Sequence, residues 1–180
     1  MSRRKKQVVS DLLDLSRAVP PPEEQELMWE RLEHETDRSA AIWAGAHVEL
    51  ILREAIRTRL ADPGPQLTES WFIKEGAPFS TFAAKIHLGR GLVILGPKTE
   101  RYLKAIKDIR NAFAHSVHHL TFGHKAIIDR IRILEPEEIV SLSAAEARSC
   151  YIDSCSNIAN ELIDYAKKHS GENLGFPPLV

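Results

Sequence analysis

The stretch that decides the fold is IKDIRNAFAHSVHHLTF, residues 106–122. Its apolar residues Ile106, Ile109 and Phe113 recur at three- and four-residue steps, which places them on one face of an α-helix. The same spacing continues upstream, and it predicts a helix from about residue 97 to residue 115. Polar and basic residues occupy the positions between these apolar residues, so the segment combines a face that packs into the core with side chains that could bind a ligand or catalyse a reaction.

Four more segments have helical periodicity and are bounded by proline, glycine or capping residues. They are residues 23–61 with a break near Asp37, residues 78–96 with Ser80 as the candidate N-cap, residues 124–134, and residues 143–169, which open with a capping box of Ser143 and Glu146. Thr99 is the candidate cap of the helix that ends at residue 115. No convincing run of alternating apolar and polar residues suggests a strand. The sequence therefore predicts an all-α fold, a single bundle of about five to six helices.

The domain organisation follows from length and from the two ends of the chain. A chain of 180 residues favours one domain with a substantial core. Residues 1–22 predict a flexible N-terminal arm with a basic head at Arg3, Arg4, Lys5 and Lys6, a short apolar piece at residues 8–15 and a stiff run of prolines. The bundle is expected over residues 23–170, with a C-terminal tail at residues 171–180.

Composition narrows the classes of function. Lys+Arg at 24 and Asp+Glu at 25 leave a net charge of -1, so any polyanion site has to be a local patch. Cys150 and Cys155 are too few for a disulfide framework and predict reduced thiols. No apolar run approaches the roughly 20 residues of a membrane span. We therefore expect a cytoplasmic protein with no membrane partner.

The polar groups of residues 106–122 divide between two sides of the expected helix. At 100° per residue, Asp108, Asn111 and His115 fall within about 60° of one another, beside the apolar stripe. Arg110 lies about 140° around from His115 and about 7.5 Å along the helix axis. One helix alone therefore does not bring Arg110 and His115 into a tight pair, whereas two copies facing each other across a two-fold interface could.

Two interpretations of these residues stay open. As a catalytic site they suit metal-independent RNA cleavage, with His115 taking the proton from a 2′-hydroxyl and Arg110 holding the scissile phosphate. Asn111 and Asp108 would then orient the imidazole or the sugar. As a structural network, the same residues only tie helices together, and a histidine near a helix C-terminus gains from the helix dipole.

Histidines cluster after the expected helix, at His115, His118, His119 and His124. A metal site needs several ligands on one face with a carboxylate or cysteine nearby, and the helix is expected to end before these histidines can share a face. We therefore predict a polar loop edge, with neither a metal nor a cofactor.

Three segments together resemble the mannitol operon repressor family. They are FSTFAAKI at residues 79–86, IRNAFAH at residues 109–115 and LTF at residues 120–122. Upstream, ETDRSAAIWAGAHVELILREAI at residues 35–56 resembles the family's first main helix, with Asp37 and Arg38 in place. The resemblance covers roughly residues 30–165.

The resemblance implies an all-α fold and a role as a repressor that has no recognisable DNA-reading module of its own. Its Arg-x4-His pattern is also the hallmark of the wider HEPN class of helical domains. Many of those are metal-independent endoribonucleases that act as dimers, often as toxins, and others keep the fold without activity. The residues carried over to this chain are Arg110, Asn111 and His115.

The sequence therefore leaves three candidate functions. The first is regulation of gene expression through protein partners, with a homodimer as the expected assembly. The second is a toxin-like endoribonuclease in which Arg110, His115 and Asn111 are catalytic. The third is a helical adaptor without chemistry. Direct contact with RNA or DNA stays open, and the accessory polar residues would be Asp108, His119, Asp37 and Arg38.

Overall fold

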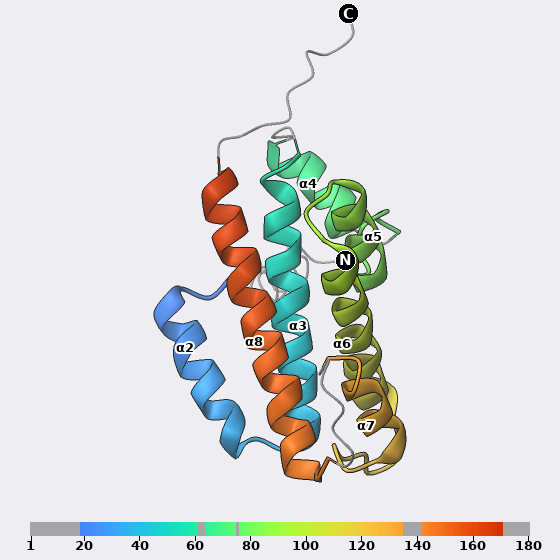
Figure 1. The fold of residues 1–180 in the computed structure, drawn as a ribbon. Coiled ribbons are helices and arrows are strands. Elements are labelled where there is room, and N and C mark those ends of the chain that lie inside the picture. The colour runs from blue at the N-terminus through green and yellow to red at the C-terminus, as the bar shows by residue number, and fades with distance from the viewer. Residues whose placement is uncertain (1–18, 61–63, 75, 135–141, 171–180) are drawn as a thin grey trace, which may run out of the picture.

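The computed structural model describes residues 19–60, 64–74, 76–134 and 142–170. In these ranges the chain forms seven α-helices and no strand (Figure 1). The helices are α2 (Pro22–Arg31), α3 (Asp37–Arg57), α4 (Gly64–Phe72), α5 (Phe82–Gly91), α6 (Pro97–His115), α7 (Lys125–Ile131) and α8 (Ala144–His169), with a 3-10 turn at Leu32–His34. The all-α prediction is confirmed.

The number of helices is one above the expected upper limit, because α4 was not predicted. Residues 61–66 contain two prolines and a glycine, a composition that typically ends a helix. Proline is equally at home in the first turn of a helix, where its missing N–H has no partner to lose. Here Pro65 follows Gly64 at the start of α4, so residues that would be expected only to end a helix also begin one.

The predicted boundaries of two long helices are confirmed. The helix α6 runs from Pro97 to His115, and α8 opens with the Ser143–Glu146 capping box and reaches His169. The break expected near Asp37 also exists, since α3 starts there with Thr36 as its N-cap.

Two predicted caps are wrong. Thr81 rather than Ser80 caps α5, by accepting a hydrogen bond from the Ala84 amide at 3.1 Å. The Ser80 hydroxyl instead donates to the Ala77 carbonyl at 2.8 Å. Thr99 does not cap α6, because Gly96 occupies the N-cap position and Pro97 already provides the first helical turn.

The core surrounds α3, which packs against α8, α6 and α5. Figure 1 shows α3 in the middle of the bundle, with α8 on one side and α5 and α6 on the other. Its inward face carries small residues and aliphatic residues that are fully buried, among them Ala41, Ala44, Val48 and Leu52. Small residues let neighbouring helices approach closely, so α3 can contact three helices at once.

None of the described helices is long and apolar enough to cross a membrane. The predictions for residues 1–18 and 171–180 lie outside the described residues. The segment at residues 19–21 leads into α2, whose first residue is Pro22.

Candidate functional site

Arg110 lies where α6 is in tight contact with α3 at Gly45. A Cβ atom built on Gly45 of α3 would lie 2.8 Å from the Arg110 Cβ and 2.9 Å from its Cγ, nearer than real Cβ atoms come. Glycine at this position is therefore what admits the arginine stem. The guanidinium then extends along α3 toward Glu49, one helical turn further on.

Glu49 accepts a cation on each of its two carboxylate oxygens. The Arg110 Nη2 donates to one oxygen, and the Lys85 ammonium on α5 donates to the other at 2.6 Å. Lys85 also donates to the Ser80 carbonyl at 2.8 Å. These contacts join three helices through one carboxylate, and we refer to Arg110, Glu49 and Lys85 as the Arg–Glu–Lys network.

The network is largely withdrawn from solvent. The exposed fractions of the side chains are 7% for Lys85, 18% for Glu49 and 21% for Arg110. Charged groups at this depth are stable only when they are paired and hydrogen-bonded. The Arg110 guanidinium also lies 5.7 Å from the centre of the Phe82 ring, within the range of a cation–π contact. Arg110 is thus held by charge, by ring contact and by the packing at Gly45.

Glu49 and Lys85 were not among the predicted site residues, although the sequence carried a signal for them. Both occur in short helical runs made mostly of apolar residues, VELIL at residues 48–52 and AAKIH at residues 83–87. Lysine and glutamate are rarely buried without a partner. Two opposite charges on two core faces therefore indicate a cross-helix pair, but which helices meet cannot be read from the spacing within one helix.

His115 lies apart from this network. It is the last residue of α6 and is exposed, whereas Arg110 faces α3. No hydrogen bond joins the two side chains within the described part of the chain. This arrangement agrees with the separation expected from the helical angle. Asn111 is partly buried, one turn before His115 on the same side of α6.

Asp108 is engaged in ion pairs and is not joined to His115. Its two carboxylate oxygens lie 2.6 Å from the Lys107 ammonium and 2.5 Å from the Arg130 guanidinium of α7. The contact with Arg130 links α7 to α6 through side chains that are 44% and 31% exposed, so Asp108 forms a surface ion pair between those two helices.

Asp37 and Arg38 hold the segment after α6. Arg38 donates to the Ser116 carbonyl at 2.7 Å and to the His118 carbonyl at 3.1 Å. Asp37 accepts from the Phe122 amide at 3.0 Å and from Arg148 of α8 at 2.6 Å. The start of α3 therefore fixes both ends of the histidine-containing segment at residues 116–122.

His119 is exposed within that segment and lines a shallow hollow of about 600 Å³ together with Asp37, Arg38 and His118. Across the described residues, no group of three or more histidine, cysteine, aspartate or glutamate side chains is arranged to hold a metal ion. Cys150 and Cys155 are both buried and unbridged, and burial raises the pKa of the Cys155 thiol far above its usual range.

A second buried polar group lies between α2 and α3. His47 is only 4% exposed, and its Nε2 has no hydrogen-bond partner within the described residues. The Trp43 ring stacks on it at 5.1 Å between ring centres, and the Trp29 ring meets it edge-on at 5.4 Å. Burial lowers the pKa of His47 to about 4, so the ring is neutral near pH 7.

The fold and the site together define an all-α bundle tied by a central Arg–Glu–Lys network. No family model, no curated protein and no solved structure matches this chain.

Proposed function

We propose that this protein regulates gene expression in the manner of the mannitol operon repressors, which it resembles, and that it acts through protein partners. The observation that favours this proposal over catalysis at Arg110 is the engagement of Arg110 by Glu49 inside the bundle. An arginine in that position ties helices together and shares the single carboxylate of Glu49 with Lys85. The Arg-x4-His pattern is then part of the scaffold.

A phosphate clamp would require the Arg110 guanidinium to leave Glu49. That movement would leave the carboxylate paired only with Lys85 and would remove the contact with Phe82. Breaking a buried ion pair costs about 3–5 kcal/mol when it leaves a buried charge unpaired, and the cost here is smaller because Lys85 still compensates Glu49. RNA binding at Arg110 has to offset the loss of the Glu49 pair and of the Phe82 contact before it contributes to catalysis.

The remaining parts of the proposal are the location and the assembly. We place the protein in the cytoplasm and propose that it acts as a homodimer.

Support for the regulatory role comes from the three segments that resemble the repressor family, all of which lie in or directly beside α5 and α6. Action through partners is supported by the sequence, in which no short helix pair with a polar, exposed second helix stands out as a DNA-reading module.

To test the regulatory role, the gene is deleted from its host and the levels of all transcripts are measured. The expected result is a rise in a small set of transcripts, which returns to normal when the wild-type gene or the His115→Ala variant is supplied. Purified protein is expected not to retard DNA carrying the promoters of those transcripts. Tight and sequence-specific retardation by the protein alone would contradict action through protein partners.

The second candidate is a metal-independent endoribonuclease. The observation that favours it is the exposure of His115 at the end of α6, where an imidazole is accessible to RNA and where Asn111 lies one turn away. For this activity Arg110 would be released from Glu49 when RNA binds or would be supplied by a second copy. Cleavage of RNA in the presence of a chelator, lost in His115→Ala, would establish it.

A helical adaptor without catalytic activity is the third candidate, and it shares the first proposal's structural role for Arg110.

A further inference from the structure

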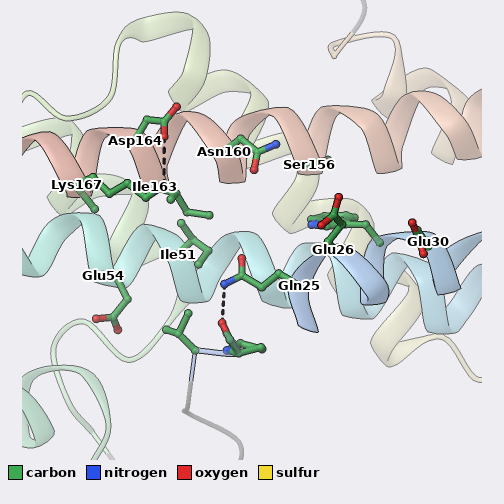
Figure 2. A pocket seen from close by; sticks show the side chains of 14 residues that line it. Gln25, Glu26, Glu30, Ile51, Glu54, Ser156, Asn160, Ile163, Asp164 and Lys167 are labelled. Carbon is green, nitrogen blue, oxygen red and sulfur yellow. Dashed lines mark hydrogen bonds and ion pairs between the residues drawn. The ribbon is translucent and has the colours of Figure 1, made fainter. Parts of the chain in front are cut away.

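An open groove runs between α2, α3 and α8, on the other side of the bundle core from α5 and α6. Its volume is about 820 Å³, and its apolar lining includes Trp29, Ile51, Ile163 and Ala166 (Figure 2). Pockets of about 300–1,000 Å³ typically bury most of the surface of a small ligand. Trp29, Ile163 and Ala166 are partly exposed there, whereas Ile51 is already buried, at 3% exposed.

Acidic side chains border the groove. Its lining holds four carboxylates, at Glu26, Glu30, Glu54 and Asp164, and one cation, at Lys167. Glu54 is already paired with Arg53 at 2.7 Å and with Arg57 at 2.9 Å. Lys167 lies 3.8 Å from Asp164, so the only ammonium of the lining is already next to a carboxylate. Glu26 and Glu30 form no ion pair with any described residue. The groove therefore suits an occupant that is apolar on one side and carries positive charge.

The chain itself supplies such a segment directly next to the groove. Val19 and Pro20 are lining residues, and Gln25 fixes this end of α2 by donating to the Pro20 carbonyl at 2.6 Å (Figure 2). Residues 1–18 directly precede Val19 in the sequence. They carry a basic head at residues 3–6, followed by apolar residues at 8, 9, 12, 13 and 15.

The spacing of these apolar residues fits a helix with one apolar face. At 100° per residue, Val8, Val9, Leu12, Leu13 and Leu15 fall within an arc of about 160°, and Asp11 and Asp14 fall outside it. Eight residues of helix are about 12 Å long, whereas Ser156 to Lys167 of α8 span about 17 Å. Residues 8–15 are therefore short enough to lie along the groove.

We infer that residues 8–15 of the same chain dock in the groove between α2, α3 and α8, with their apolar face on Trp29 and Ile163 and with the basic head near the free carboxylates of α2. Docking within one chain is favoured over docking between chains because the tether at Val19 holds the segment at a high effective concentration. The inference is independent of the proposed function, since neither the Arg–Glu–Lys network nor His115 takes part in it.

Hydrogen–deuterium exchange on the full-length protein tests this inference. The amides of residues 8–15 are expected to exchange about tenfold or more slowly than the same sequence in an unfolded chain, unchanged on dilution of the protein. The double variant Leu12→Ser/Leu13→Ser is expected to remove that protection and to raise exchange in α2. It alters no residue of the described bundle, so the bundle keeps its fold.

A matched pair of charge changes tests the acidic border. Glu26→Lys/Glu30→Lys is expected to reduce the protection of residues 8–15 about tenfold, through repulsion of the basic head. Glu33→Lys/Glu161→Lys makes the same change of net charge at exposed positions outside the groove and is expected to leave the protection unchanged.

Three results would overturn the inference. Exchange of residues 8–15 at the unfolded rate in the wild type would show that the segment is free and the groove open to another protein. Protection that disappears on dilution would assign the occupant to a second copy. If both pairs of lysine substitutions reduced the protection equally, the protection of residues 8–15 would depend on the total charge of the protein and not on the carboxylates of this groove.

Discussion

Glu49 on α3 and Arg110 on α6 are 61 residues apart in the sequence, and their side chains form a partly buried ion pair between these two helices. Lys85 of α5 completes the pairing on the other carboxylate oxygen. The Arg-x4-His pattern of α6 is thus divided between two environments, because Arg110 points into the bundle and His115 is exposed at the end of α6. That division is the main reason to treat the pattern as part of the scaffold.

Glu49→Gln is expected to destabilise the protein strongly. The substitution leaves Arg110 and Lys85 facing a neutral amide in a site with little access to water, and disrupting a buried ion pair typically costs about 3–5 kcal/mol. The free energy of unfolding, measured by chemical denaturation and monitored by circular dichroism, should fall by about 3 kcal/mol.

The matched control for this prediction is Asp129→Asn. Asp129 also meets two cations, Lys125 and Arg132, but its side chain is 42% exposed and those of its partners are 88% and 47% exposed. Surface pairs contribute about 0–1 kcal/mol, so the control should have little effect. Equal losses of stability in the two variants would mean that burial does not distinguish the Glu49 network.

Gly45→Ala is expected to be destabilising even though alanine favours a helix by about 1 kcal/mol over glycine. The new Cβ would lie 2.8 Å from the Arg110 Cβ and 2.9 Å from the hydroxyl of Tyr151, which is fully buried. Overpacking of this kind costs about 1–3 kcal/mol. Gly91→Ala is the control, because a Cβ there meets nothing within 4 Å. If Gly45→Ala were as stable as the wild type, α3 and α6 would not be in the close contact described here.

The sequence predicted the long helices well because their signals are local. The stripe of Ile106, Ile109 and Phe113 and the Ser143–Glu146 capping box each lie within one segment, and both helices have the predicted ends. The pairing of Glu49 with Arg110 was not predicted, since it depends on which faces of α3, α5 and α6 meet. That choice depends on the close approach at Gly45, and the spacing within one helix contains no information about it. The start of α4 was missed because its proline and glycine serve equally well to end a helix.

His47 is expected to make the protein less stable in acid. Its pKa is lowered to about 4 in the folded state, from 6.5, because burial beneath Trp29 and Trp43 disfavours the charged ring. The unfolded chain therefore binds the proton more tightly. The stabilisation from neutral His47 is complete above about pH 6.5 and is lost as the pH falls toward 4, by at most about 1.4 kcal/mol per pH unit.

The measurement is the free energy of unfolding of wild type and His47→Phe between pH 7 and about pH 4. Phenylalanine keeps the ring contacts and removes the titrating group, so the variant should show a shallower loss in this window. Parallel curves for the two proteins would assign the acid sensitivity to other groups.

Asp37→Ala is expected to loosen the segment after α6 while the bundle stays folded. The Phe122 amide would lose the carboxylate that accepts its hydrogen bond, and Arg148 would lose its ion pair. Faster hydrogen–deuterium exchange should appear at the Phe122 amide, by about tenfold, with little change at the centre of α8. If exchange rose equally along α8, Asp37 would be supporting the whole bundle and not this segment.

The most direct test of the central claim is cleavage of RNA by the purified full-length protein in the presence of a chelator, with wild type compared with His115→Ala. Because His115 is exposed, this substitution can remove a catalytic imidazole without disturbing the core. A scaffold role for the Arg-x4-His pattern predicts no cleavage above a protein-free control for either protein. Cleavage by the wild type that is lost in a correctly folded His115→Ala variant would contradict that role and would establish the endoribonuclease.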